Sequence, residues 1–396
     1  MDAMVGILQG FRVLDFTQAM AGPFCTMMLA DMGAEVIKIE RPKVGDVSRQ
    51  WISIGEKGKA IYYNYVNRNK KSVTLNLKSK KGREIAYKLL READVAMENF
   101  RPGVMKGLGL DYETARGLNP RIIYCSISGY GQDDPRGGWD LIAQGEWGLI
   151  SITGSDEDHM AKVGVPIADI GAGMYSAYAI ALALLHREKT GRGQRIDVAL
   201  LDTIVSWMTY WMGICYTTGE EIKPIGIAHP MLAPYEAFKA KDNRLITLGV
   251  GNDKLWRKFC QVAGIEGLAD DPRFATNEDR VKNHDALVPI VSQIIATRES
   301  EEWIKTMLEV GIPCARINRV SDVLRHPDVI RRNMVREMEI APGNKILMAG
   351  IPIKFSETAG EVRDPPPRLG QHTDEVLRWL GYSDREIEEL REKGVI

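Results

Sequence analysis

The chain has 396 residues, of which 44% are hydrophobic and 27% charged, and its 52 basic and 53 acidic side chains give a formal net charge of −1. This length suits two structural units, because single hydrophobic cores stop growing at about 250–300 residues. The balanced charge argues against a nucleic-acid-binding protein, which normally carries a basic excess.

The sequence also indicates a compartment. The first residues, MDAMVGILQG, have no cationic segment followed by a long apolar run, so we expect no signal peptide. No uncharged apolar stretch of about 18 residues is present, so we expect no membrane association. The five cysteines are dispersed and form no CxxC pair, and the six histidines are dispersed as well. We therefore expect a cytoplasmic protein with neither disulfides nor a bound metal.

Short β-branched segments alternate with helical segments over the first 130 residues. The predicted strands are 11–16, 34–40, 72–78, 95–100 and 122–130, and the predicted helices include 24–32 and 81–93. This alternation predicts an α/β fold with a parallel sheet. Ligands bind beyond the carboxyl ends of such strands, so the loops 17–23, 41–46 and 99–103 are expected to form the site.

The remainder of the chain predicts a second unit and a further helical end. A buried helix is expected at 169–186, a strand at 194–200 and an aromatic helix at 203–216. Beyond a change of composition at 219–230, separate strands (245–250, 313–318) and helices (254–262, 301–310) predict a smaller domain. One more strand from 346 and charged helices at 373–380 and 383–393 complete the chain.

One aspartate stands out at the start of the predicted buried helix. The sequence contains no GxGxxG, GxxxxGK[ST], GxSxG or HExxH motif, but it reads PIADIGAG around Asp169. Asp immediately before a helix is typical of an N-cap. The same position suits a nucleophile, because a helix N-terminus favours the ionised carboxylate and lowers its pKa. Gly171 and Gly173 would leave room for a bulky group and expose amides for an oxyanion.

A basic segment offers two interpretations. Residues 68–83, RNKKSVTLNLKSKKGR, contain seven basic side chains and no acid. Such a segment can form a solvated, charged surface. It can also bind a polyanion such as the ADP 3′-phosphate of coenzyme A.

Taken together, these segments resemble the class III coenzyme A-transferases, the CaiB/BaiF family, along nearly the whole chain. The matching segments are LQGFRVLDFTQAMAGPFCTMMLADMGAEVIKIERP, NRNKKSVTLNLKSKKGRE, ADVAMENFRPGVMKGLGLDYE, NPRIIYCSISGYGQ, PIADIGAGMYSAYAIALALLHREKTGRGQRIDVALLD and LGQHTDEVLRWLGYS.

The resemblance implies a large Rossmann-like, coenzyme A-binding domain from residues 1–219, a small α+β domain from 220–330, and a return to the large domain over 331–396. It also implies an interlocked homodimer. In such an enzyme Asp169 attacks an acyl-CoA thioester, and coenzyme A then passes to a carboxylic acid through an aspartyl anhydride and an aspartyl thioester. Acyl-CoA is a substrate here, and no permanently bound cofactor is expected.

Further site residues follow from the same resemblance. Gln18 is expected to act at the thioester together with Asp169. The implied coenzyme A contacts are Ala21, Arg41, Leu75, Lys78, Asn99, Phe100, Arg101, Lys106, Trp139 and Asp140.

Two departures from the family pattern affect these expectations. The segment 104–108 reads VMKGL, so Lys106 replaces or loses an arginine contact of some relatives. Apolar Met20 stands where formyl-CoA:oxalate relatives carry a glutamine, and 226–230 reads GIAHP where those relatives have a glycine-rich lid. Oxalate is therefore not the expected acceptor.

Two alternatives remain at this level. An α-methylacyl-CoA racemase shares the resemblance but requires a histidine where this chain has Trp139, whose indole N–H only donates. A non-catalytic coenzyme A-binding subunit is expected to lack Asp169, which is present.

Overall fold

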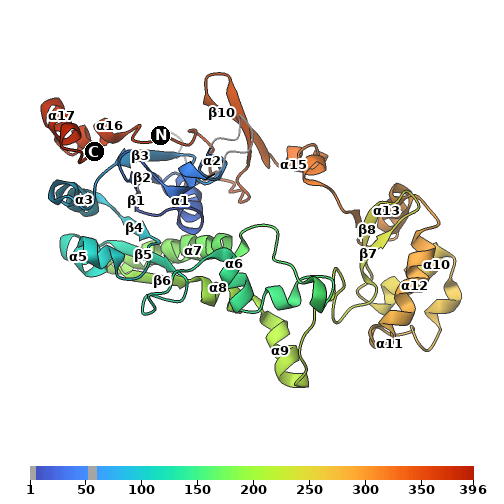
Figure 1. The fold of residues 1–396 in the computed structure, drawn as a ribbon. Helices are drawn as coiled ribbons and strands as arrows, with labels where there is room; N and C mark the ends of the chain where they lie inside the picture. Colours follow the sequence, from blue (N-terminus) through green and yellow to red (C-terminus); the bar gives the residue numbers. More distant parts are fainter. Residues whose placement is uncertain (1–5, 52–59) are drawn as a thin grey trace. The chain divides into compact units, whose positions relative to one another are not determined.

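The structure is a computed structural model that describes residues 6–51 and 60–396, and it divides into two compact units (Figure 1). The larger unit takes its residues from 1–149, 163–218 and 328–396, and the smaller unit from 150–162 and 219–327. The segment 150–162 thus groups with the smaller unit, although the predicted boundary placed it in the larger one.

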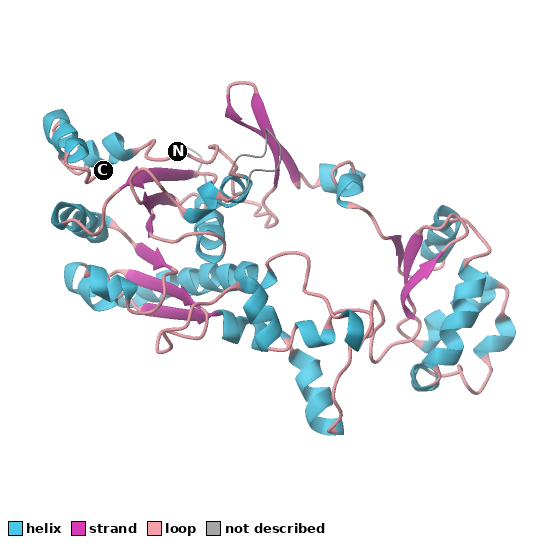
Figure 2. Ribbon diagram, viewed as in Figure 1, coloured by secondary structure: helices cyan, strands magenta, loops and turns pink. Residues whose placement is uncertain are grey.

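A six-stranded parallel sheet forms the centre of the larger unit, which confirms the predicted parallel α/β architecture (Figure 2). Its strands are β1 (Arg12–Asp15), β2 (Glu35–Glu40), β3 (Lys70–Thr74), β4 (Val95–Glu98), β5 (Ile123–Ser128) and β6 (Arg195–Ala199). Their spatial order is β3-β2-β1-β4-β5-β6. The order reverses between β1 and β4, and ligands of such sheets bind at the carboxyl ends of the strands on either side of this point.

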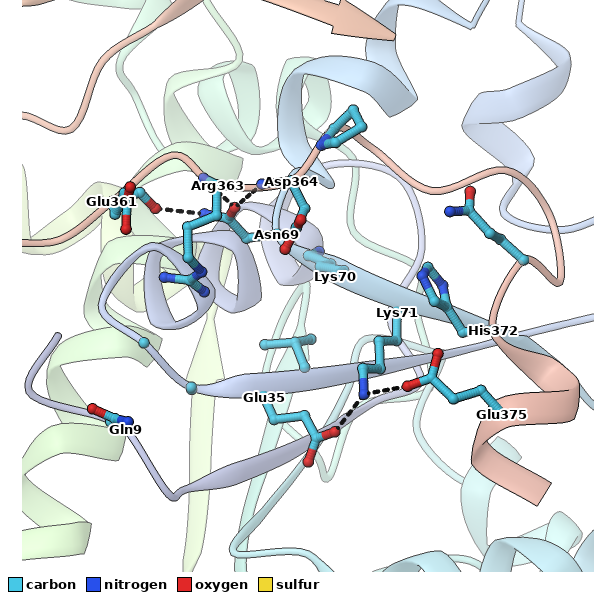
Figure 3. A pocket seen from close by; sticks show the side chains of 15 residues that line it. Gln9, Glu35, Asn69, Lys70, Lys71, Glu361, Arg363, Asp364, His372 and Glu375 are labelled. Carbon is cyan, nitrogen blue, oxygen red and sulfur yellow. Dashed lines mark hydrogen bonds and ion pairs between the residues drawn. The ribbon is translucent and has the colours of Figure 1, made fainter. Parts of the chain in front are cut away.

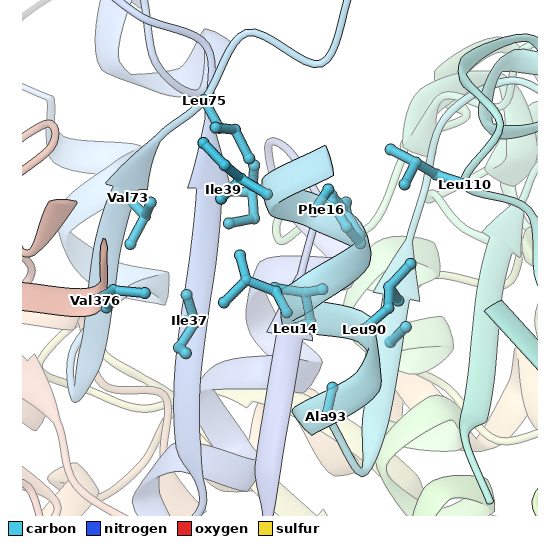
Figure 4. Packing of buried hydrophobic residues seen from close by; sticks show 14 of the residues in the cluster. Leu14, Phe16, Ile37, Ile39, Val73, Leu75, Leu90, Ala93, Leu110 and Val376 are labelled. Atoms are coloured by element: carbon cyan, nitrogen blue, oxygen red, sulfur yellow. The ribbon is translucent and has the colours of Figure 1, made fainter. Parts of the chain in front are cut away.

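Helices cover both faces of the sheet. The helices of the larger unit are α1 (Ala21–Asp31), α2 (Ile61–Val66), α3 (Lys80–Glu92), α4 (Val104–Leu108), α5 (Tyr112–Leu118), α6 (Asp140–Glu146), α7 (Ile167–Thr190), α8 (Leu200–Trp207), α9 (Thr209–Thr218), α16 (Thr373–Trp379) and α17 (Asp384–Glu392), with α15 (Pro327–Arg331) at its boundary. Successive strand residues point to opposite faces. Val13 accordingly packs with α1, α7 and α8, whereas Leu14 packs with α3 and α16 (Figure 4).

The C-terminal segment returns to the larger unit and covers the edge strand β3. The Ser72 N–H donates to Nδ1 of His372 over 3.1 Å, and the Thr74 N–H donates to the hydroxyl of Thr373 over 3.0 Å. Val376 of α16 is buried beside Val73 (Figure 4). These bonds use N–H groups that an edge strand otherwise leaves unpaired.

Three local predictions differ from the structure. The helix expected at 203–216 is two helices, α8 and α9. The helix is interrupted between Trp207 and Thr209, and the φ of Thr209 is +31°. Strand β3 covers Lys70–Thr74, so it begins two residues and ends four residues earlier than the strand expected at 72–78. The strand expected from 346 is β11 (Asn344–Ala349), which pairs with an unpredicted antiparallel partner, β10 (Val335–Ala341).

The smaller unit has its own core. An antiparallel sheet of β7 (Tyr235–Lys239), β8 (Leu245–Gly249) and β9 (Cys314–Arg316) packs against helices around buried Trp256 and Trp303. Its helices are α10 (Asp253–Ala263), α11 (Asn277–Lys282), α12 (His284–Ile295), α13 (Ser300–Glu309) and α14 (Val320–Val323), with short 3-10 turns at Ile150–Ile152, Glu157–His159 and Glu266–Ala269.

Helix α7 crosses the larger unit in close contact with α1. By length and apolar composition α7 would also suit a membrane span, but ten of its residues, Ala172 and Ile180 among them, are buried within the unit. A Cβ atom on Gly173 would lie 2.7 Å from the carbonyl oxygen of Ala21. Glycine at this position therefore lets the two helices touch through their backbones.

This contact yields a stability prediction. We expect Gly173→Ala to reduce the free energy of unfolding by about 1–3 kcal/mol, because the methyl group must separate two packed helices. Equilibrium denaturation followed by tryptophan fluorescence measures the effect. The control is Gly117→Ala in α5, where an added Cβ meets nothing within 4 Å, and which should be neutral or stabilise by up to about 1 kcal/mol. Equal stability of the two variants would contradict the packing argument.

Candidate active site

The loop that follows β1 lies at the point where the strand order reverses, and it is clamped from the neighbouring strand. The Gln18 N–H donates to Oδ1 of Asn99 over 2.8 Å, and Nδ2 of Asn99 donates to the Gln18 carbonyl over 2.8 Å. The next residue, Ala19, has a φ of +63°, and its N–H donates to Asp46 over 3.1 Å. The side chain of Asn99 thus fixes the backbone of Gln18.

Buried ion pairs support this loop from below. Lys38 is fully buried, donates to the Thr17 carbonyl over 2.7 Å and pairs with Asp46 at 3.0 Å. Lys70 pairs with Asp15 at 3.2 Å, and burial lowers the Lys70 pKa to about 8. Burial alone would raise the pKa of Asp15, but the two lysines outweigh it and hold that pKa well below its usual range. Removing one member would leave an uncompensated buried charge.

These pairs correct the interpretation of the basic segment 68–83. Arg68 binds Asp31 at 2.6 Å, Lys70 binds Asp15, and Lys71 lies 2.9 Å from Glu35. Arg68 and Lys70 are therefore neutralised in the interior and Lys71 is paired at a partly exposed position, so these three side chains form no continuous polyanion-binding surface. Lys78 stays exposed, and in the described part of the chain it forms no ion pair.

Asp169 lies within α7 rather than before it. The helix begins at Ile167 with Pro166 as N-cap, so Asp169 is the third helical residue and the expected N-cap position is wrong. The cap comes from α6 instead: Oδ1 of Asp140 accepts the Ala168 N–H over 2.8 Å and the Asp169 N–H over 3.4 Å.

The electrostatic expectation for Asp169 is also reversed. Burial and the neighbouring Asp140 carboxylate raise the pKa of Asp169 to about 7, whereas the helix N-terminus alone predicts a lowered pKa. Burial of Asp169, together with the second carboxylate at the same helix end, outweighs the favourable helix dipole.

Gly171 and Gly173 serve packing rather than substrate access. A Cβ atom on Gly171 would lie 2.0 Å from the ring of Trp207, so the indole fills the expected space. Both glycines lie beyond the first turn of α7, where N–H groups bond within the helix, so they offer no oxyanion donors. Because Asp169 is one turn before Gly173, it lies on the side of α7 that faces the start of α1.

The remaining predicted residues follow the carboxyl ends of neighbouring strands. Arg41 follows β2, Leu75 and Lys78 follow β3, and Asn99, Phe100 and Arg101 follow β4, while Gln18 and Ala21 follow β1. Arg41, Arg101, Lys106 and Trp139 are exposed. The Leu75 side chain is buried in the core, which leaves only its backbone to face a ligand. Both Asp140 oxygens are engaged within the protein, by α7 and by Gln144.

Sequence reasoning missed the residues that hold the site from beneath. These are Lys38, Asp46 and Gln144, all buried. A signal existed for one of them: Lys38 interrupts the apolar strand sequence EVIKIE, and a lysine in a strand buried on both faces requires an acidic partner.

Two hollows lie near predicted site residues. One of about 170 Å³ is lined by Arg101 and Lys106 together with Glu98, whose pKa burial raises to about 7. The other, of about 280 Å³, lies between the N-caps of α1 and α7. It is lined by Met20, Ile61, Tyr62, Tyr65, Val66 and Pro166, none of which carries a charge.

A larger cavity, of about 610 Å³, lies at the opposite edge of the sheet (Figure 3). The first residues of β2 and β3 line it together with the C-terminal segment, and Lys71 there pairs with Glu35 and Glu375. Asn69 accepts from the backbone N–H groups of Arg363 and Asp364, each over 2.8 Å. None of the predicted site residues lines this cavity.

Known proteins match nearly the whole chain. A family model described as CoA-transferase family III matches residues 8–373. Succinyl-CoA:glutarate CoA-transferase of Homo sapiens is 38% identical, over 98% of this chain and 90% of that protein. Succinate--glutarate CoA-transferase of Agrobacterium fabrum is 40% identical over 96% of each, and acetyl-CoA:oxalate CoA-transferase of Acetobacter aceti is 36% identical over 89% of this chain and 90% of that protein.

Solved structures agree with the sequence matches. A CaiB/BaiF family protein from Brucella suis has a TM-score of 0.82 and 34% identity, covering 95% of this chain and 99% of that one. A hypothetical protein from Mycobacterium tuberculosis has a TM-score of 0.83 and 30% identity, covering 94% of this chain and 99% of that one.

Proposed function

This chain belongs to CoA-transferase family III and catalyses acyl-CoA:carboxylate CoA transfer, and we propose that the transfer runs through covalent intermediates on Asp169. The observation that supports the proposal is the place of Asp169 on α7, one turn before Gly173, on the side of the helix that faces the start of α1. Helix α1 begins directly after the loop that follows β1, and the loops at this end of the strands are where this type of sheet binds its ligands.

The proposed reaction has four bond exchanges. A carboxylate oxygen of Asp169 attacks the thioester carbonyl, the carbon–sulfur bond breaks, and coenzyme A leaves as a thiolate. The thiolate attacks the aspartyl carbonyl of the resulting anhydride and releases the donor acid. The acceptor carboxylate attacks the aspartyl thioester and frees the thiolate again. The thiolate finally attacks the acceptor carbonyl, which regenerates the Asp169 carboxylate. Each exchange is easier than direct attack of a carboxylic acid on a thioester.

Coenzyme A is proposed to lie along the carboxyl edge of the sheet. Gln18 and Ala21 approach the thioester, the backbones of Leu75, Asn99 and Phe100 line the pantetheine arm, and Trp139 lies alongside. Exposed Arg41, Lys78, Arg101 and Lys106 are available for the phosphates, since none of them forms an ion pair in residues 6–51 or 60–396. The five cysteines are free, which suits a reducing compartment such as the cytoplasm.

No observation favours the racemase. Trp139, at the position that a racemase needs for a proton-transferring histidine, is 65% exposed at the start of α6. Exchange of deuterium into the α-position of a branched acyl-CoA would be its signature.

A homodimer is part of the proposal, because the larger unit exposes apolar side chains over two helices. Met174, Tyr178, Leu182 and Leu185 follow one another along α7 at helical spacing, and each is about half or more exposed. Helix α9 has no buried residue. An apolar surface of this kind marks a protein–protein interface.

The nucleophile is tested by substitution and trapping. We expect Asp169→Ala to lower transfer by at least about a thousandfold, because the group that becomes acylated is lost, while coenzyme A affinity and melting temperature stay near wild type. Hydroxylamine added during wild-type turnover should give a hydroxamate at residue 169, detected by mass spectrometry. Near-normal transfer by the variant, or repeated failure to trap an adduct in an active protein, would exclude this mechanism.

The phosphate contacts are tested by binding. We expect Arg41→Ala and Lys78→Ala each to raise the Kd for coenzyme A roughly tenfold, because each removes a charged hydrogen-bond donor to phosphate. Isothermal titration calorimetry measures the Kd. The difference in Kd between wild type and each variant should become smaller at high salt, because exposed charges are then screened. Lys80→Ala is the matched control, since Lys80 is exposed in the same basic segment but is not an expected contact. An unchanged Kd in the first two variants would remove those residues from the site.

The dimer is tested by sedimentation. We expect the wild-type protein to sediment as a dimer and Leu182→Glu to shift it toward monomer, because a buried unpaired carboxylate destabilises an apolar interface. Leu308→Glu, at an equally exposed leucine of α13, should leave the dimer intact. A monomeric wild-type protein would contradict the proposal.

A further inference from the structure

The carboxylate of Asp140 occupies the N-terminus of the nucleophile's helix from outside that helix. Pro166, the N-cap of α7, contributes no side-chain cap. Oδ1 of Asp140 takes this role and accepts the N–H groups of Ala168 and Asp169 at 2.8 and 3.4 Å. These partners are 28 and 29 residues away in the chain, so α6 and α7 are joined at this point.

A second buried residue fixes the position of Asp140. Nε2 of Gln144, one turn later on α6, donates to Oδ2 of Asp140 over 2.6 Å. Gln144 is fully buried, and its Oε1 accepts the Val163 N–H over 2.9 Å. Both oxygens of Asp140 are therefore held, and the Asp140 carboxylate cannot turn away from α7.

The surroundings supply no counter-ion for this pair of acids. Just beyond Asp169, the start of α1 presents Ala21, Phe24 and Cys25 to Gly173 of α7, and α8 presents Thr203 and Trp207 to Gly171. Cys25 is the titratable group among them, and burial raises its thiol pKa well above the usual range, so it stays neutral. Within the described ranges, neither Asp140 nor Asp169 forms an ion pair, and Asp140 is the charged group that acts on Asp169.

From this arrangement, and resting on the proposed role of Asp169, we propose that Asp140 is a positioning residue whose fixed negative charge at the start of α7 controls when Asp169 is ionised and able to attack. A carboxylate close to another carboxylate favours a proton on one of them. The charge of Asp140 thus makes Asp169 a stronger base, and therefore a better nucleophile once ionised, while it raises the pH that ionisation requires.

The sign of the pH dependence follows directly. Burial and Asp140 raise the pKa of Asp169 to about 7, so the nucleophile is lost by protonation as the pH falls below neutrality. The kcat/KM of wild-type transfer should therefore decline on the acid side near pH 7, since this parameter reports the free enzyme. Without the charge of Asp140, the decline should occur at lower pH.

The Asp140→Asn substitution removes the negative charge of residue 140 but keeps its capping hydrogen bond to α7. Its amide oxygen still accepts the Ala168 N–H, but the negative charge is gone. We expect both the Asp169 titration and the acid limb of kcat/KM to move down by roughly one pH unit. The titration is followed by ¹³C NMR of aspartate carboxyl carbons, with Asp169→Asn to assign the signal. Asp140→Ala removes the cap as well and should lower the Tm more than Asp140→Asn does.

A double variant guards against misfolding. In Asp140→Asn the new amide faces the Gln144 amide, donor against donor. Asp140→Asn combined with Gln144→Glu restores that hydrogen bond and returns a negative charge, now at position 144, which does not bond the start of α7. The acid limb of this double variant should therefore lie between those of wild type and Asp140→Asn. Glu146→Gln, which removes an exposed charge from the same helix, is the control and should leave the Asp169 titration unchanged.

The outcomes distinguish this inference from the proposed function. The hydroxamate at residue 169 is measured in parallel in every variant. If the adduct forms but neither the Asp169 titration nor the acid limb moves in Asp140→Asn, the role of Asp140 is overturned and the nucleophile stands. If the pKa of Asp169 shifts but the acid limb of kcat/KM does not, the proposal that Asp140 controls the attack by Asp169 is likewise overturned. A shift of both the Asp169 titration and the acid limb of kcat/KM to lower pH supports the proposed role of Asp140.

Discussion

The site depends on burying lysines beneath the loop that follows β1. A charged amine inside an apolar core is costly unless a carboxylate and further acceptors surround it, and Lys38 and Lys70 meet that condition. Lys38 joins the Thr17 carbonyl to Asp46, and Asp46 in turn accepts the Ala19 N–H. The left-handed conformation at Ala19 is thereby fixed from below, and the Gln18 backbone is presented at the carboxyl edge of the sheet.

The parallel order of the sheet could be predicted from the sequence, because strand composition and alternation are local properties. The fate of the basic segment could not. Arg68 and Lys71 are neutralised by Asp31 and by Glu35 and Glu375, and nothing local in the sequence shows these pairings. The same limit applies to Gly171, whose missing side chain admits the indole of Trp207 from a later helix.

Asp169 illustrates how tertiary context reverses a local rule. A helix N-terminus stabilises an anion, yet here a second anion already uses the free N–H groups of that terminus. Burial and this second anion together give a carboxyl group whose pKa lies near neutrality, where basicity and the ionised fraction are both substantial. The resemblance predicted a role for this residue, whereas its electrostatic environment emerged only from the fold.

The bonds that cover β3 affect how the chain is synthesised. Ser72 and the residue that caps it, His372, are separated by 300 positions. At roughly 5–20 residues per second, a ribosome takes about 15–60 s to cross that distance. For this interval a nascent chain carries a finished strand with an open edge, which is the kind of surface that pairs with other strands. The edge of β3 is covered only after His372 and Thr373 have emerged from the ribosome.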